Sequence, residues 1–232
     1  MQRRLIGPVL VLAFAVSAAS AANLIVNGDF ESGTLAGWSE FDQAGGSGSW
    51  FALSGTSGPL SGEPTVGPAG GSFYALTDQT GPGSHVLLQS FTVAGGSQML
   101  SFDMFVNNWA GIVVGCDGLD YTVSPTECGR VDILTGTANP FDTGAGVVMN
   151  LYQGSDPFGT NPNPYTAYSF ALNLPAGTYQ LRFAETDNQL FFNMGVDNVV
   201  LTSGSTPEPG TLVIFGSGLL GIGGWIRRKM IR

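Results

Sequence analysis

The 232-residue sequence predicts an all-β fold, a sandwich or a barrel. Three observations support this. Short apolar or alternating segments recur between residues 23 and 206, Gly, Pro and Asn separate them, and no convincing amphipathic helix interrupts them. Several strands of this length with such turn residues are typical of all-β domains. This part of the chain is also long enough to form one domain with its own core.

The expected strands follow one another from a Trp/Phe-rich segment near residue 50 to a closing apolar segment near residue 200. Leu181 and Phe183 alternate with polar neighbours, as a strand with one buried face requires. Segments 44–48, 56–71 and 156–164 contain too many Gly and Pro residues for regular structure and are predicted to be loops. The predicted strands are 48–53, 73–77, 85–93, 98–107, 130–135, 147–152, 165–174, 178–186 and 190–202.

An internal similarity predicts two β-hairpins. Residues 90–95 lead to Leu100-Ser101-Phe102, and residues 169–177 lead to Leu181-Arg182-Phe183. Each unit reads as a strand, a turn that contains Gly, and a second strand with Leu-x-Phe facing inward. Two units of this kind suit a sandwich built from matching halves.

The last 26 residues of the sequence form three successive segments. Pro207-Glu208-Pro209 precedes an apolar segment, 211–226, and a basic end that starts with Arg227-Arg228. This order resembles the PEP-CTERM signal, which implies recognition by an exosortase-type membrane protease. The apolar segment would span roughly 24 Å as a helix, and the basic cluster would stay in the cytoplasm. A permanent single-span anchor is the alternative.

The N-terminus predicts export. Arg3 and Arg4 precede an apolar run, 5–16, and small residues follow it up to Ala22, which is the pattern of a signal peptide. The expected organisation is therefore a signal peptide (1–22), a β-sandwich domain (23–203), a linker with the PEP motif (204–210), a transmembrane sorting helix (211–226) and a basic cytoplasmic tail (227–232). After sorting, we expect the protein at the cell surface or outside the cell.

The domain between the two signals is strongly acidic. It contains sixteen of the 17 acidic residues and only two of the eight basic ones, Arg130 and Arg182, so its net charge is about −14. Such a domain is a poor partner for nucleic acid or for anionic lipid headgroups. Its carboxylates suit calcium, although most of them are explained by solubility alone.

Both ends of this domain resemble galactose-binding-like jelly rolls, a group that includes many carbohydrate-binding modules. The opening Asn23–Glu31 segment has the N-G-x-F-E pattern and precedes Gly37-Trp38, and the closing segment 195–201 places Asp197 before a short apolar run. The resemblance implies a jelly-roll β-sandwich that binds polysaccharide. It also implies that Glu31 and Asp197 share a structural calcium ion. Alternatively, Glu31 caps a turn and Asp197 accepts backbone N–H groups. Trp38 is expected in the core.

Sugar binding requires aromatic faces with polar groups beside them. Trp109 is the first candidate, because Asn108 precedes it and a glycine follows two residues later, a composition typical of an exposed turn. Trp50 and Tyr165 are further candidates near strand ends or loops, and Asn108 could supply hydrogen bonds to the sugar. Taken singly, each of these aromatic residues is better explained by a place in the core or in a packed loop.

Cys116 and Cys128 are the only two cysteines in the sequence. Since the chain is predicted to enter an oxidising compartment, we expect them to form a disulfide. The loop between them would contribute roughly 3 kcal/mol to stability on the loop-entropy argument.

The sequence argues against an enzyme. It has one histidine, His85, no G-x-S-x-G motif and no glycine-rich phosphate loop. We therefore expect a non-catalytic protein that binds exopolysaccharide. The alternatives are a structural matrix protein that acts by self-association and a glycoside hydrolase with a carboxylate pair, which pairs only in three dimensions.

Overall fold

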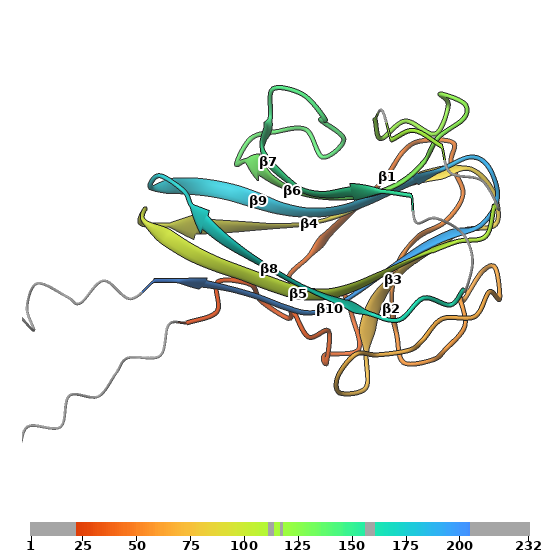
Figure 1. Ribbon diagram of the computed structural model, residues 1–232, viewed down its shortest axis with the longest axis horizontal. Helices are drawn as coiled ribbons and strands as arrows, with labels where there is room; N and C mark the ends of the chain where they lie inside the picture. The colour runs from red at the N-terminus through yellow and green to blue at the C-terminus, as the bar shows by residue number, and fades with distance from the viewer. Residues whose placement is uncertain (1–21, 111–113, 117, 156–160, 205–232) are drawn as a thin grey trace, which may run out of the picture. The chain divides into compact units, whose positions relative to one another are not determined.

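A computed structural model describes residues 22–110, 114–116, 118–155 and 161–204 of the chain. These residues form one compact unit of ten strands and contain no helix, which confirms the predicted all-β fold (Figure 1). The strands are β1 (Ser39–Asp42), β2 (Ser49–Leu53), β3 (Tyr74–Asp78), β4 (Gly83–Val93), β5 (Ser97–Asn108), β6 (Glu127–Thr135), β7 (Val147–Gly154), β8 (Thr166–Asn173), β9 (Gly177–Asp187) and β10 (Phe192–Ser203).

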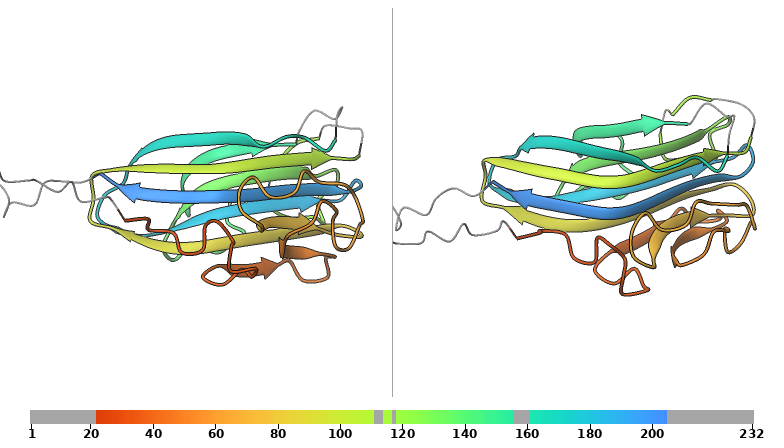
Figure 2. Two further views of the ribbon diagram at one scale, coloured as in Figure 1. Left: turned by 90° about the horizontal axis from the view of Figure 1, so that it is seen from below. Right: turned by 60° about the horizontal axis from the view of Figure 1, so that its bottom comes forward.

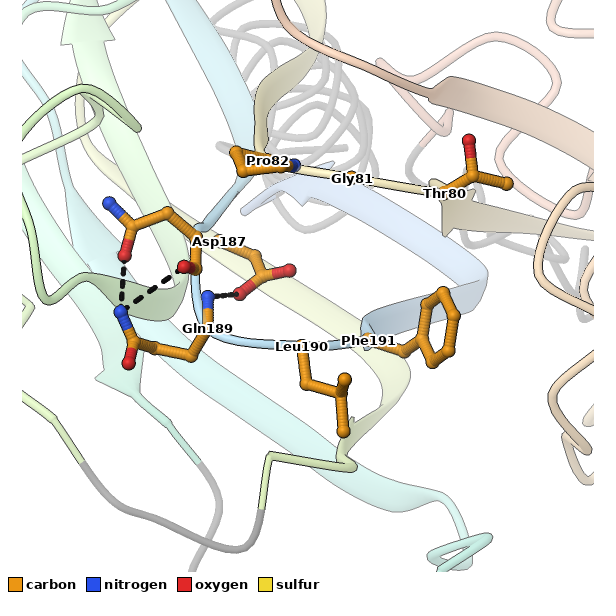
Figure 3. A pocket seen from close by; sticks show the side chains of 8 residues that line it. Thr80, Gly81, Pro82, Asp187, Gln189, Leu190 and Phe191 are labelled. Atoms are coloured by element: carbon orange, nitrogen blue, oxygen red, sulfur yellow. Dashed lines mark hydrogen bonds between the residues drawn. The ribbon is translucent and has the colours of Figure 1, made fainter.

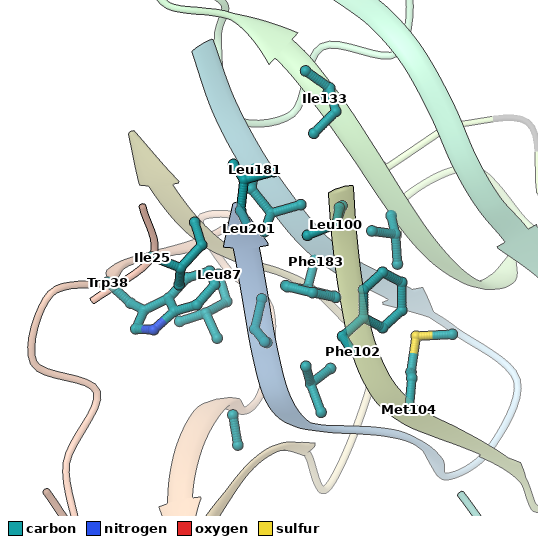
Figure 4. Close-up of a cluster of buried hydrophobic side chains, with 14 of the residues drawn as sticks. Ile25, Trp38, Leu87, Leu100, Phe102, Met104, Ile133, Leu181, Phe183 and Leu201 are labelled. Atoms are coloured by element: carbon teal, nitrogen blue, oxygen red, sulfur yellow. The ribbon is translucent and has the colours of Figure 1, made fainter. Parts of the chain in front are cut away.

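Two five-stranded antiparallel sheets pack face to face. The order in one, here called the β9 sheet, is β1-β4-β9-β6-β7, and the order in the other, the β10 sheet, is β2-β3-β10-β5-β8. Alternate residues of each strand point into the space between the sheets, where apolar side chains form the main core (Figure 4). Phe102 from the β10 sheet meets Phe183 from the β9 sheet edge to face, with ring centroids 5.1 Å apart.

The two predicted hairpins are wrong. Strand β4 pairs with β1 and β9, whereas β5 pairs with β10 and β8, so the turn between β4 and β5 crosses from one sheet to the other. The turn between β8 and β9 crosses in the same way. The inward Leu-x-Phe patterns are nevertheless as expected, because Leu100 and Phe102 face Leu181 and Phe183 across the core. A local sequence shows which side chains are buried, but not which strand pairs with which.

Loops cover part of the outer face of each sheet. In Figure 2 the segment between β2 and β3 lies across the outer side of the β10 sheet. It is attached by the Tyr74 hydroxyl, 2.6 Å from Thr65 Oγ1, and by backbone N–H groups of the loop that donate to the Asp78 carboxylate. On the β9 sheet, the loop between β6 and β7 is held by Arg182, whose Nη1 donates to the carbonyls of Pro140 and Asp142, each at 2.7 Å.

The two ends of the described domain lie together. The amide of Leu24 donates to the carbonyl of Leu201 (2.7 Å), and Asn23 forms an isolated antiparallel β-bridge with Thr202. Figure 1 shows that the loops joining β3 to β4 and β9 to β10 lie at the opposite end of the sandwich. No helix that could cross a membrane occurs among the described residues. The predicted sorting helix and signal peptide lie outside them.

Strand β1 was not predicted. Its sequence, Ser-Glu-Phe-Asp, is exposed along its whole length at the edge of the β9 sheet. A strand without a buried face has no apolar periodicity, so only its pairing with β4 identifies it.

Candidate functional site

A pocket of about 200 Å³ opens at the end of the sandwich far from the termini. We call it the loop pocket (Figure 3). Two connections line it, the β3–β4 connection with Thr80, Gly81 and Pro82, and the β9–β10 connection from Asp187 to Phe191. The lining therefore combines a hydroxyl, a carboxyl and side-chain amides with the apolar side chains of Pro82, Leu190 and Phe191.

Hydrogen bonds hold the β9–β10 connection in shape. Asp187 Oδ1 accepts the backbone N–H of Gln189 (2.8 Å), and Gln189 Nε2 donates to Asn188 Oδ1 (2.6 Å). Asn188 in turn donates through Nδ2 to the carbonyls of Tyr121 and Val123 (2.6 and 2.9 Å). Asn188 thus ties the pocket wall to the loop that precedes β6. Leu190 is not enclosed by these contacts and remains 51% exposed.

Three carboxyl groups lie behind the pocket, between the sheets. We call Glu127, Glu185 and Asp187 the carboxyl cluster. Glu127 lies opposite Asp187 in the β6–β9 pairing, and Glu185 lies two residues before Asp187 on the same face of β9. All three are fully buried. Asp187 belongs both to the cluster and to the pocket lining.

Amide groups supply much of the hydrogen bonding of the cluster. Gln79 Nε2 donates to Glu185 Oε1 (2.9 Å), Asp187 Oδ2 (3.3 Å) and the Phe192 carbonyl (2.8 Å). Asn108 Nδ2 donates to Glu127 Oε2 (2.8 Å). The other carboxyl oxygens of Glu127 and Glu185 are buried without a hydrogen-bond partner among the described residues.

Burial controls protonation in the cluster. Burial, and after it the charge of Asp187, raise the pKa of Glu127 to about 8, and the Asn108 hydrogen bond opposes both. Burial also raises the pKa of Glu185 well above its ordinary value and raises that of Asp187. Glu127 and Glu185 therefore keep their protons at neutral pH, which removes the cost of two buried negative charges. Among the described residues, no three His, Cys, Asp or Glu side chains are grouped as a metal site.

Trp109, the first predicted sugar-binding residue, lies next to the pocket wall. Its backbone N–H donates to the carbonyl of Phe191 (2.9 Å), and its side chain is half-buried. Asn108 is 1% exposed and serves the carboxyl cluster, so the expectation that it binds ligand at the surface is corrected. The Asn-rich composition of the segment predicted an exposed turn, but could not indicate that Asn108 points inward.

Trp50 and Tyr165 do not border the loop pocket. Trp50 is 2% exposed in the main core, which corrects its assignment as a ligand-binding residue. Tyr165 is half-buried on the outer face of the β10 sheet, where its ring meets Phe105 edge to face at 5.0 Å. The sequence did not single out Gln189 or Leu190, because the segment 190–202 reads as one apolar strand and conceals the loop at its start.

Glu31 and Asp197 come together on one short segment, 69–73. Asp197 Oδ2 accepts the N–H groups of Ala69 and Gly70 (2.9 and 3.0 Å). Glu31 Oε1 accepts those of Ser72 and Phe73 (2.7 and 2.8 Å). These contacts agree with the alternative to a shared calcium ion, in which carboxylates accept backbone N–H groups. Carboxylate oxygens are also a ligand type that calcium takes.

Gly71 allows this arrangement. Its φ of +58° is in the left-handed region, and a Cβ atom at this position would overlap the Glu31 carboxylate. The segment can therefore approach Glu31 only because residue 71 has no side chain.

Two other expectations are confirmed. Cys116 and Cys128 form a disulfide with a Cα–Cα distance of 5.1 Å, which links the loop after β5 to β6. Trp38 is a core residue: its ring packs against Phe30 and Phe183, and its Nε1 donates to the Asn27 carbonyl (3.1 Å).

His85, the one histidine in the sequence, is buried in β4 with Nδ1 2.7 Å from Asp42 Oδ1.

The end of the chain matches a known sorting motif. Residues 205–229 match the PEP-CTERM protein-sorting motif, as the sequence predicted. This match indicates an exported protein that is anchored in the membrane during sorting. The predicted motif residues Pro207, Glu208, Pro209, Arg227 and Arg228 all lie within it but outside the described residues. No curated protein matches the chain.

Solved structures share the fold of the domain. The carbohydrate-binding module TmCBM61, solved in complex with β-1,4-galactotriose, has a TM-score of 0.51 and 10% identity, over 79% of this chain and all of that one. The K3 adhesin domain of Lys-gingipain from Porphyromonas gingivalis w83 has a TM-score of 0.53 and 22% identity, over 80% of this chain and all of that one. At these identities the likeness shows the fold alone. The domain is a jelly-roll β-sandwich of the kind found in carbohydrate-binding modules.

Proposed function

We propose that this exported protein binds polysaccharide without catalysis and that the loop pocket holds a sugar unit. The composition of the pocket lining carries this proposal. A pyranose has apolar C–H faces and a rim of hydroxyls, and the pocket offers Leu190, Phe191 and Pro82 for the faces. Thr80 and Gln189 supply hydrogen bonds for the rim. The pocket is smaller than those of drug-sized ligands, which suits a single unit of a chain.

The burial of the carboxyl cluster supports a non-catalytic role over a hydrolase. Catalytic carboxyl groups must reach a glycosidic bond and the water beside it. Glu127 and Glu185 lie between the sheets with no exposed surface, and their outer neighbour Asp187 is occupied by Gln79 and the N–H of Gln189. We therefore assign the carboxyl cluster a structural role behind the pocket.

The direction of β10 supports a role at the cell surface. The strand begins beside the pocket at Phe192 and ends at Ser203, where the chain continues to the sorting motif. Twelve extended residues span roughly 36–40 Å. The pocket is therefore far from the residue at which the sorting segment begins, which leaves it accessible to matrix polysaccharide. We infer that residues 1–22 are removed on export and that the final location is the surface or the extracellular matrix.

Replacing Leu190 by alanine should weaken polysaccharide binding about tenfold, because the pocket loses its exposed apolar wall. The measurement is affinity electrophoresis of the full-length chain in detergent through gels with soluble galactan, xylan or hydroxyethyl cellulose. Leu60→Ala is the matched control, since Leu60 is 45% exposed in the β2–β3 loop and does not line the loop pocket.

Retardation that is equal for wild type and Leu190→Ala would remove the pocket from the binding site. No retardation on any polymer by a folded protein would favour the alternative of a structural matrix protein. Release of reducing sugar from the polymer would establish the hydrolase alternative.

We also propose that Glu31 and Asp197 hold calcium, with carbonyls of the adjacent backbone as further ligands. The ion would fasten segment 69–73 between the first and last parts of the domain. Chelation with EDTA should then lower the melting temperature by about 5 °C or more. Glu31→Gln should melt lower than wild type and show no response to EDTA. An unchanged wild-type melt would show that the carboxylates act through the N–H groups alone.

A further inference from the structure

Three aromatic side chains line the open long edge of the sandwich, where β7 and β8 face each other. We call Tyr152, Tyr168 and Phe170 the edge strip. Tyr168 and Phe170 are two residues apart on β8 and share a face, and their ring planes differ by only 8° with centroids 6.3 Å apart. Tyr152, from β7, stands edge to face against Tyr168 at 5.7 Å and 74°.

The edge strip is supported from one side. Buried Phe102, the residue of β5 that pairs with Tyr168, packs against both β8 rings, with centroids 5.2 Å from Tyr168 and 6.0 Å from Phe170 and with planes within 28° of each. The two rings are themselves only half-buried. Each ring is therefore held by contact with the main core and keeps an accessible part at the edge of the sandwich. The Tyr168 hydroxyl has no hydrogen-bond partner among the described residues.

We propose that the edge strip is a second binding surface, which takes successive units of a neutral polysaccharide. Two nearly parallel rings with a third ring edge-on beside them form an apolar surface at the edge of the sandwich, and a sugar can stack its C–H face on an aromatic ring. The site is separate from the loop pocket, which holds one unit, and the proposal rests on the proposed function by extending the bound chain.

The charge of the domain selects a neutral chain. The domain has a net charge of about −14, which repels an anionic polymer. Its two arginines, Arg130 and Arg182, both bind the buried carboxylate of Asp132 and have no exposed charge to offer a sugar acid. The occupant is therefore a glycan without carboxylate or sulfate groups.

Tyr168→Leu tests the proposal, because leucine keeps apolar packing on Phe102 but removes the flat ring. The full-length chain in detergent is titrated with hydroxyethyl cellulose, galactan and polygalacturonate, and with short neutral oligosaccharides of increasing length. We expect about a tenfold loss of affinity for a neutral polymer and no change for single sugars. Phe170→Leu should act in the same direction, and Tyr168→Phe should bind as wild type does. Tyr179→Leu is the control, since Tyr179 is a half-buried tyrosine stacked on Phe91 outside the strip.

Each result separates the strip from the pocket. If the folded Tyr168→Leu and Phe170→Leu variants bind the neutral polymer as tightly as wild type does, the proposal that the edge strip binds polymer is overturned. This holds whatever the result for Leu190→Ala. Loss of binding in Tyr168→Leu with none in Leu190→Ala would overturn the pocket and keep the strip. Stronger binding of polygalacturonate than of the neutral polymers would overturn the neutral occupant. A wild-type dimer that Tyr168→Leu converts to a monomer, with polymer binding unchanged, would show that a second copy covers the strip.

Discussion

Replacing Asp132 by asparagine should lower the free energy of unfolding by about 3–5 kcal/mol. Asp132 is fully buried on the outer side of the β9 sheet, where Oδ2 accepts from Arg182 Nη2 (2.5 Å) and Oδ1 from Arg130 Nη2 (3.1 Å). Burial lowers the pKa of Arg182, and the Asp132 charge opposes that shift. The substitution leaves two buried guanidinium groups without their counter-charge. Urea unfolding at pH 7 measures the loss.

The cost should come from the unpaired charges and not from the lost volume. The triple variant Asp132→Leu, Arg130→Met and Arg182→Met removes all three charges together, and should be less destabilised than Asp132→Asn. It still loses the two hydrogen bonds by which Arg182 holds the β6–β7 loop, so it should not exceed wild type by much. If the free energy of unfolding of Asp132→Asn is within about 1 kcal/mol of the wild-type value, the proposed dependence on Asp132 is contradicted.

Replacing Glu127 by glutamine should stabilise the protein by about 1–3 kcal/mol at pH 8.5 and leave it unchanged near pH 4. The folded-state pKa of Glu127 is raised to about 8, whereas the unfolded chain ionises near its ordinary value of 4.5. Between these values the unfolded chain releases a proton that the folded protein keeps. The contribution of Glu127 to stability is therefore complete at acid pH and is lost as the pH rises from about 4.5 to 8. Glutamine does not titrate and retains an oxygen for Asn108.

Melting curves of wild type and Glu127→Gln at pH 4, 6.5 and 8.5 test this sign. Glu185 and Asp187 also have raised pKa values, so wild type should itself lose stability as the pH rises through this range. Glu63→Gln is the control, because Glu63 lies in the β2–β3 loop, away from the cluster and half-exposed. Parallel curves for wild type and Glu127→Gln at all three pH values would show that Glu127 is ionised in the folded protein.

The candidate site illustrates the limit of sequence reasoning. The polar turn around Trp109 placed this residue at the end of the sandwich where the loop pocket also lies, because turn residues lie at strand ends. The pocket itself is made by two connections that are about 105 residues apart along the chain, 80–82 and 187–191. The pairing of β9 with β4 places them together, and neither segment has a composition that marks it as a site. The pairing of β9 with β6 gathers the carboxyl cluster, whose members look like ordinary surface acids in the sequence.

The sequence by itself determined the all-β class, most strand positions, the inward Leu-x-Phe patterns, the disulfide and the sorting motif. All of these depend on local periodicity, on short motifs or on the presence of just two cysteines. Only the tertiary structure decided that β4 and β5 belong to different sheets, that Trp50 and Asn108 are buried, and that Glu127, Glu185 and Asp187 meet between the sheets. The physical reason is that periodicity fixes the face of a strand on which a side chain lies. The partner of that strand is set by how all ten strands together bury their apolar faces.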